Sequence, residues 1–248
     1  MESIKCLNYK TIELLSKHKL LKTLIRSEII QDELKKIYID DKRKEELIYE
    51  FKKQQNIIED DQYEKFLNIN HLNDSDVEDI SLGDTRMDEY ILNNFGHKIE
   101  SWFLERKSKL DIIVYSLIRV SDPFLARELF LRILSKEADI GDLATEFSEG
   151  IEKKTRGVVG PLPIGNSHPS LAKFLQNCEI GKVQKPIKVN NSYLIIRVEN
   201  FEPVQLDEDM RNNMGEELLN KWLDIKADDI IKKLLKNDSS KSNDSIAS

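Results

Sequence analysis

Apolar residues over the N-terminal part of the chain recur at the three- or four-residue spacing of amphipathic helices. From Thr11 to about Tyr38 they form one broad face with charged residues between them, which predicts helix with a break near His18. Asp41 is expected to cap a second helix that runs to about Gln55. No strand pattern occurs before residue 108. The chain is therefore expected to begin with a helical module over residues 1–108.

The end of this module predicts several shorter helices. A short helical segment is expected at 63–67, and Ser75 to Glu78 has the spacing of a capping box. Residues 84–92 and 95–107 predict two further helices, with a hinge between them at Gly96.

The pattern changes to that of a mixed α and β domain over residues 109–203. Three apolar runs are expected to be strands, at 111–120, 185–189 and 192–201. Three helices are expected between them, at 123–135, 141–149 and 168–176, with a charged loop at 150–161. Strands that are distant in sequence and enclose helices predict the α+β fold class.

Residues 206–235 return to a helical pattern. An apolar stripe follows this helix, formed by Met210, Met214, Leu218, Trp222 and Ile225. Such a stripe has to be buried, and the central domain is small, so segment 204–236 is expected to pack on the N-terminal module. The polar, low-complexity residues 237–248 predict a disordered tail.

Composition narrows the classes of function. A net charge of −7 makes nucleic acid an unsuitable main partner, because a phosphate backbone selects for basic surfaces. The N-terminal residues lack the pattern of a signal peptide, and no apolar run is long enough to insert into a membrane, so a cytoplasmic location is expected. Cys6 and Cys178 are expected to be free thiols. The scattered histidines predict no metal site, and no motif predicts a cofactor.

Particular motifs of the central domain resemble a known family. In order they are LARELFLRI, DLATEFSE, a loop that ends in G-x-x-G, HPSLAKFL and EIGKVQKPIKVNNSYLIIRVE. Together they resemble a parvulin-type (PpiC-type) peptidyl-prolyl isomerase domain. The flanking helices resemble the layout of SurA-like and PrsA-like foldases and chaperones. The resemblance implies a four-stranded antiparallel sheet with surrounding helices, and unfolded or extended polypeptides as clients.

The resemblance also marks five groove positions, and all of them depart from the family. Its histidine on the first strand corresponds to Ser116, or to Leu117 if the register slips by one residue. Its cysteine or aspartate corresponds to Gly150, its methionine to Ser167, its phenylalanine to Leu171 and its second histidine to Leu194. No residue is therefore assigned a catalytic role. Ser116 and Leu194 also fit ordinary packing within strands, and the basic residues Lys153, Lys154 and Arg156 fit a solvated surface as well as an acidic peptide.

Three functions remain open. Rotation about an Xaa–Pro bond breaks no bond and moves no proton, so loss of the histidines weakens catalysis without excluding it. The first hypothesis is a cytoplasmic foldase or chaperone that binds extended or proline-containing segments and has weak or no isomerase activity. The second is an isomerase that uses unusual groove residues. The third is an adaptor for one partner, in a peptide-export or peptide-modification apparatus.

Overall fold

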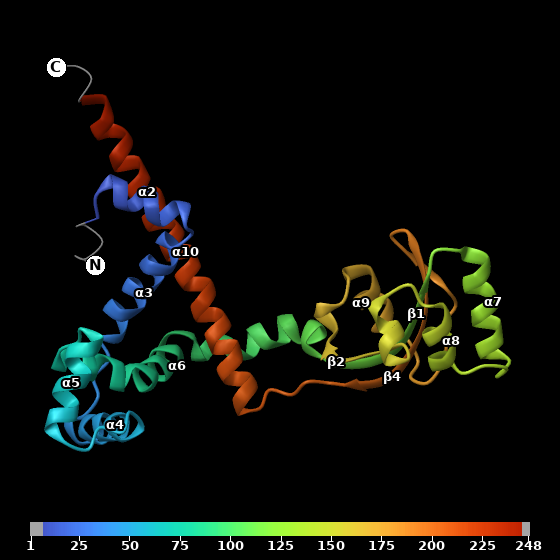
Figure 1. Ribbon diagram of the computed structural model, residues 1–248, viewed down its shortest axis with the longest axis horizontal. Coiled ribbons are helices and arrows are strands. Elements are labelled where there is room, and N and C mark those ends of the chain that lie inside the picture. Colours follow the sequence, from blue (N-terminus) through green and yellow to red (C-terminus); the bar gives the residue numbers. More distant parts are fainter. Residues whose placement is uncertain (1–6, 245–248) are drawn as a thin grey trace. The chain divides into compact units, whose positions relative to one another are not determined.

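The computed structural model describes residues 7–244, and these residues fall into two compact units (Figure 1). The helical unit extends to Ile99 and resumes at Glu208, and the sheet unit spans Glu100–Asp207. The first boundary therefore lies inside a continuous helix, whereas the sequence places it at residue 108.

Among residues 7–244, six helices belong to the helical unit. They are α2 (Tyr9–Lys17), α3 (Leu21–Leu34), α4 (Asp41–Gln54), α5 (Asp60–Asn70), the first part of α6 (Asp74–Leu110), and α10 (Glu208–Asp244). The predicted break near His18 is present: α2 ends there, and Lys19 adopts a left-handed backbone conformation with φ of 60°. The N-cap of α4 is Asp40, whose carboxylate accepts a hydrogen bond from the backbone N–H of Arg43, rather than Asp41.

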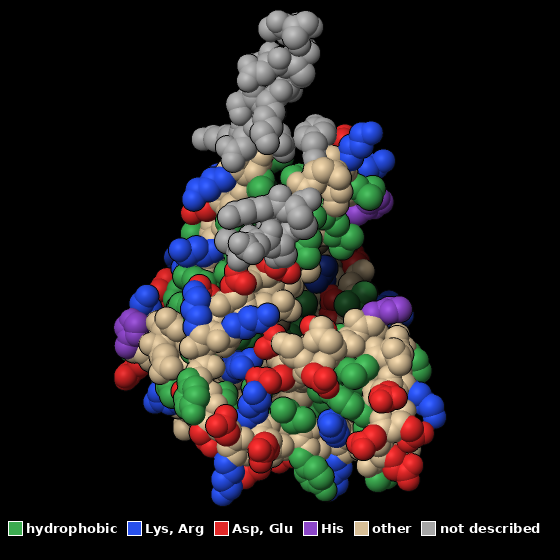
Figure 2. All heavy atoms as spheres, turned by 90° about the vertical axis from the view of Figure 1, so that its left-hand side faces the viewer, with side chains coloured by type: hydrophobic (Ala, Val, Ile, Leu, Met, Phe, Trp, Pro, Cys, Tyr) green, Lys and Arg blue, Asp and Glu red, His purple; other side chains and the backbone are tan. Residues whose placement is uncertain are grey.

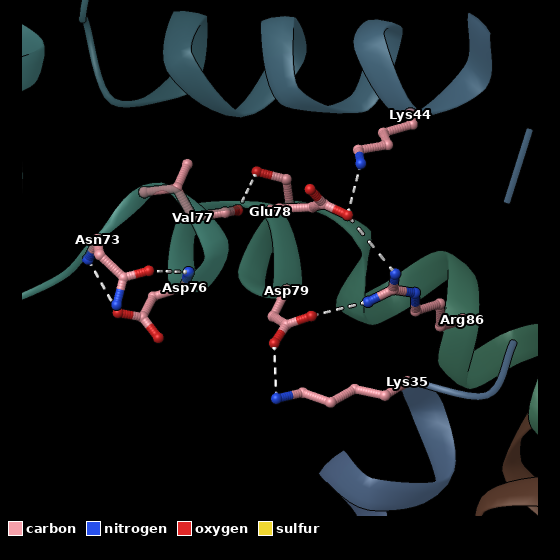
Figure 3. Close-up of polar contacts among 9 residues, drawn as sticks. Lys35, Lys44, Asn73, Asp76, Val77, Glu78, Asp79 and Arg86 are labelled. Carbon is pink, nitrogen blue, oxygen red and sulfur yellow. Dashed lines mark hydrogen bonds and ion pairs between the residues drawn. The ribbon is translucent and has the colours of Figure 1, made fainter. Parts of the chain in front are cut away.

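Helix α6 differs from its prediction in two ways. It is not interrupted at Gly96, and Phe95 and Ile99 on either side of that glycine are buried. Its N-terminus is closed by Asn73 and Asp76, whose side chains each accept a hydrogen bond from the other residue's backbone N–H (Figure 3). The expected capping box at Ser75 to Glu78 is therefore displaced by two positions.

Ion pairs join α3 and α4 to the start of α6 (Figure 3). Arg86, whose side chain is only 11% exposed, binds Asp79 at 3.0 Å and lies 4.0 Å from Glu78. Lys35 reaches Asp79 at 3.1 Å, and Lys44 reaches Glu78 at 2.7 Å. Arg86 contacts both carboxylates, and each carboxylate also pairs with one lysine. The three helices are therefore linked by a network of ion pairs rather than by isolated pairs.

The C-terminal helix α10 packs against the N-terminal helices of this unit (Figure 1). Their shared core is apolar and contains Ile12, Leu21, Ile25, Ile29, Leu34, Tyr90, Ile91, Phe95, Leu219, Leu223 and Ala227. Asp224 of α10 pairs with Lys22 at 3.1 Å and with Arg26 at 2.6 Å. Hydrogen bonds from these two cations lower the pKa of the Asp224 carboxyl, so it is charged whenever the pair can form.

Two details of α10 differ from the sequence prediction. Ile225 is 57% exposed, because the buried face follows Leu219, Leu223 and Ala227 at four-residue spacing. The helix also continues through residues 237–244, where a tail is predicted; this stretch contains neither proline nor glycine. The rest of the predicted tail, residues 245–248, lies outside the described residues.

The sheet unit contains a four-stranded antiparallel sheet, as the α+β prediction requires. Its strands are β1 (Ile112–Val120), β2 (Val158–Pro163), β3 (Ile187–Val189) and β4 (Ser192–Glu202), in the spatial order β2-β1-β4-β3. Its helices are α7 (Pro123–Leu134), α8 (Ile140–Phe147), α9 (Pro169–Leu175) and the short 3₁₀ segments η1 (Ile151–Thr155) and η2 (Ile164–Asn166). Strand β2 lies partly in the predicted charged loop; its single glycine and two prolines hide the strand pattern.

A separate apolar core lies on each face of this sheet. The α9-face core consists of Ile113, Tyr115, Leu117, Ile164, Leu171, Leu175, Leu194, Ile196 and Val198. The opposite core joins the sheet to α7 and α8, through Ile118, Val120, Ala126, Leu129, Ile133, Ile140, Leu143, Ala144 and Ile195. Neighbouring strand residues such as Leu117 and Ile118 therefore belong to different cores.

Two further observations concern the predictions from composition. Cys178 is a free thiol, and Cys6 lies outside the described residues. Within residues 7–244, no helix combines the length and the apolar character needed to cross a bilayer.

We expect Gly215→Ala to destabilise the helical unit, because a Cβ at this position would lie 2.5 Å from Cγ2 of Ile91. Overpacking of this kind costs about 1–3 kcal/mol, which outweighs the helix propensity that alanine gains over glycine. Gly83→Ala is the matched control, since a Cβ at this helical glycine would meet nothing within 4 Å. The control should stabilise the fold by up to about 1 kcal/mol. Urea unfolding measures both, and equal effects at the two glycines would contradict the close packing of α10 on α6.

Candidate functional site

A cavity of about 250 Å³ lies between the central strand and the loop that follows α8. Tyr115, Leu117 and Arg119 of β1 line one side of it, as alternate residues of one strand face. The other walls are Ile151, Glu152 and Thr155 of η1 with Val158 and Val159 of β2. Since Tyr115 and Leu117 also belong to the α9-face core, the cavity continues from that core toward solvent.

Ser148 and Glu149 fix the loop to the end of β1. The backbone N–H of Arg119 donates to Oγ of Ser148 at 3.1 Å, and the N–H of Glu149 donates to the Arg119 carbonyl at 2.9 Å. The Glu149 carboxylate accepts hydrogen bonds from the N–H and the hydroxyl of Ser121. The FSE motif therefore has a structural role, since it holds the loop beside the central strand.

Glu152 is buried in this loop and is 4% exposed. Its Oε1 accepts a hydrogen bond from the Ser148 hydroxyl at 2.7 Å, and Nε of Arg119 lies 3.6 Å away. A carboxylate taken out of water requires such partners, because an isolated buried charge costs several kcal/mol. The Arg119 side chain is 45% exposed, so it contacts the buried Glu152 and also reaches the solvent-exposed side of the cavity.

The carboxylate of Glu152 occupies the space beside Gly150. A Cβ at Gly150 would lie 2.1 Å from Oε2 and 2.3 Å from Oε1 of Glu152, well inside van der Waals contact. A side chain at position 150 and the present position of Glu152 therefore exclude each other. The glycine predicted as a groove residue contributes space rather than a functional group.

The third polar group of the cavity is the phenol of Tyr115. Burial raises its pKa, while the nearby Ser167 hydroxyl and Arg119 act in the opposite direction. Ser167, another predicted groove residue, ends the 3₁₀ segment η2. Its buried Oγ lies near the phenol but forms no hydrogen bond of good geometry. Tyr115 thus connects the cavity to the loop before α9.

Two of the residues that the resemblance marks, Leu171 and Leu194, lie together in the α9-face core. Leu171 lies on α9 and is 6% exposed, and Leu194 lies on β4 and is 4% exposed. The β1 member of the same cluster is Leu117, the residue given by the shifted register. An apolar trio from three elements therefore stands where the family resemblance implies an aromatic residue and two histidines.

Ser116 does not join this cluster. Its hydroxyl donates to Oε1 of Glu199, which also accepts a hydrogen bond from Nε of Arg197 at 2.8 Å. Strand alternation explains the difference, since residue 116 faces the opposite side of the sheet from residues 115 and 117. The pairing of β1 with β4 passes from Val114 opposite Asn200 to Tyr115 opposite Val198, so Glu199 is the extra residue of a β-bulge.

Two of the basic loop residues, Lys153 and Arg156, are engaged within the domain. Arg156 pairs with Asp142 at 2.7 Å, and Lys153 donates to the backbone carbonyl of Glu146 at 3.0 Å. Among the residues that the structure describes, no group of histidine, cysteine and acidic side chains could hold a metal ion.

Sequence reasoning missed Tyr115, Arg119 and Glu152. The first two could have been found, because residues 115, 117 and 119 alternate along a clearly predicted strand. Glu152 could not, since nothing in a run of charged residues marks one carboxylate as buried.

A comparison with sequence families finds one match in the sheet unit. Residues 124–200 match the rotamase family, described as the PPIC-type PPIASE domain. Over 140 residues, 54% of this chain, the sequence is 26% identical to the foldase protein PrsA of Caldanaerobacter subterraneus. The chain covers 45% of that relative's length. The predicted resemblance to parvulin-containing foldases is thereby confirmed.

Solved structures that resemble this chain include two PrsA peptidyl-prolyl isomerases. The protein from Bacillus cereus is 18% identical, with a TM-score of 0.48 and coverage of 93% of this chain and 88% of the other. The protein from Bacillus anthracis is 21% identical, with a TM-score of 0.42 and coverage of 87% and 97%. A SurA-like chaperone of Campylobacter jejuni is 20% identical, with a TM-score of 0.37 and coverage of 94% and 89%.

Substitutions at Leu117 and Ser116 test which of these neighbours faces the α9-face core. Leu117→Ala should cost about 2–5 kcal/mol of stability, because it leaves a cavity in that core. Ser116→Ala should cost about 0.5–1.5 kcal/mol, because Glu199 keeps its hydrogen bond from Arg197. Chemical denaturation of both variants provides the measurement. The reverse order of the two losses would show that the assigned strand face is wrong.

Proposed function

We propose that this chain, whose residues 124–200 form a PPIC-type peptidyl-prolyl isomerase domain, is a foldase-type chaperone with weak or no isomerase activity. It binds extended or proline-containing segments of unfinished polypeptides. One observation supports this function above the others: Leu117, Leu171 and Leu194, which stand where the resemblance implies two histidines and an aromatic residue, pack in one apolar cluster, and Leu117 also lines the cavity. An apolar groove favours binding of a polypeptide and lacks the polar groups that the family places there.

The physical basis lies in what an isomerase has to stabilise. The barrier to Xaa–Pro rotation is lowered only when the twisted amide is bound more tightly than either planar form. Leucine side chains contact a proline ring equally well in all three states, because dispersion and burial are not directional. The groove is therefore expected to bind such segments with little acceleration of their rotation.

Catalysis by this chain should be at least about a thousandfold slower than by a parvulin domain that keeps both histidines. This factor corresponds to a loss of about 4 kcal/mol of transition-state stabilisation. Exchange spectroscopy by NMR on a proline-containing peptide measures the rate directly, with the histidine-containing domain assayed in parallel. Rates within about tenfold of that control would favour the second hypothesis, an isomerase with unusual groove residues.

Client binding is also expected on the helical unit. Acidic, basic and apolar side chains are interspersed over its surface (Figure 2). Tyr49, Ile58 and Ile69, on α4 and α5 and in the connection between them, are 69%, 88% and 76% exposed. Exposed apolar groups that do not form a folded core are available to unfolded segments.

Replacing Tyr49, Ile58 and Ile69 with serine should weaken suppression of aggregation of an unfolded test protein. If each side chain contributes about 0.5 kcal/mol or more to client binding, the triple variant needs at least about tenfold more protein for the same effect. The matched control replaces Phe124, Leu131 and Leu134 of α7, which are 83%, 51% and 58% exposed. The control should behave like the unmodified chain, and an equal loss in both triple variants would refute a specific role for the helical unit.

The third hypothesis, an adaptor in a peptide-export or peptide-modification apparatus, predicts one stoichiometric partner instead of many clients. Co-purification with a single protein, together with no effect on aggregation, would favour it. A cytoplasmic site of action stays a prediction.

A further inference from the structure

Glu152 is the most buried charged side chain in the described part of the chain, and it lies in the wall of the cavity. Its position is determined from two directions. Ser148 donates to Oε1, and the missing side chain at Gly150 leaves room for both carboxylate oxygens. Because the Ser148 hydrogen bond and the surrounding atoms fix the position of this buried carboxylate, it can orient a neighbouring cation.

That cation is Arg119. Its Nε lies 3.6 Å from Oε1 of Glu152, and its side chain is 45% exposed at the same cavity. A guanidinium group carries five N–H donors, and this contact uses one side of it. Leu117 and Tyr115, two and four positions before Arg119 along β1, provide an apolar and an aromatic surface in the same cavity.

We propose that Glu152 is a positioning residue that holds Arg119 over the cavity, where Arg119 donates hydrogen bonds to a main-chain carbonyl of the bound polypeptide. An apolar side chain of that segment, such as a proline ring, enters the cavity. This inference rests on the proposed function and names the groups that carry out the binding.

The size and charge of the cavity identify this occupant. At about 250 Å³ it is smaller than the roughly 300–1,000 Å³ of most small-molecule sites, and it suits one side chain with its flanking main chain. An acidic ligand side chain is a poorer occupant, because it would approach the buried carboxylate of Glu152. A carbonyl oxygen accepts from Arg119 without this repulsion.

Binding of an uncharged, fluorescently labelled proline-containing peptide to the full chain tests the proposal. Arg119→Leu should weaken the Kd about ten- to a hundredfold, the range for a lost charge-assisted hydrogen bond. Glu152→Gln, which keeps the size of the side chain but not its charge, should weaken it about two- to fivefold. Gly150→Ala should reproduce the Glu152→Gln effect, since its Cβ would displace the carboxylate.

Arg132→Leu is the matched control for Arg119→Leu. Arg132 lies on α7, pairs with Glu128 at 3.8 Å and is 37% exposed, and it does not line the cavity. Its replacement should leave the Kd unchanged. Circular dichroism confirms that each variant is folded before binding is compared.

A second measurement distinguishes positioning from a merely structural role. In the unmodified chain the Nε–H proton of Arg119 should give an NMR signal that exchanges slowly with water. That signal should be lost in Glu152→Gln and in Gly150→Ala while the backbone signals of β1 persist. Persistence of the Arg119 signal, or normal peptide binding by Arg119→Leu, would overturn the inference. Absence of peptide binding by the unmodified chain would instead refute the proposed function.

Discussion

The antiparallel pairing of β1 with β4 is the constraint on which the sheet unit depends. These two central strands are distant in sequence, and each contributes residues to both apolar cores. A shift of one residue between them would exchange the two faces and place core residues in solvent. In a regular strand, an even-numbered and an odd-numbered residue face opposite sides of the sheet. The extra residue of the β-bulge, Glu199, reverses this alternation locally, so Val198 and Phe201 both pack on the α9 side. The same bulge releases Glu199 to accept the hydrogen bond from Ser116.

The register of β1 in turn decides which groups reach the cavity. Tyr115, Leu117 and Arg119 face it only because β1 is fixed on one side by β4 and on the other by β2 and the loop after α8. That loop is attached through Ser148, which accepts from the backbone of Arg119 and donates to Glu152. Strand, loop and buried charge thus form one network, in which moving any member would leave a polar group without its partner.

Most helices and three of the four strands were predictable, because their apolar residues repeat with the period of the element. Strand β2 was not predictable, since Gly160, Pro161 and Pro163 conceal its pattern. It nevertheless pairs with β1. The site was harder to predict than the fold. Leu171 and Leu194 lie in one apolar cluster, whereas the alternation of β1 places Ser116 on the other face of the sheet. The burial of Glu152 depends on the missing side chain of Gly150, a relation between two loop residues that no local pattern encodes.

The groove combines a family scaffold with an altered chemical character. Three leucines stand where the resemblance implies two histidines and an aromatic residue, so the groups that would distinguish a twisted amide from a planar one are absent at these positions, while apolar side chains remain. Since affinity depends on total burial and catalysis on the difference between states, the two properties can be lost separately. A chain under selection to hold polypeptide segments would keep the sheet register, the two cores and the loop network, because these shape the groove. It could lack the histidines and still bind, because binding depends on burial rather than on the polar groups of these side chains.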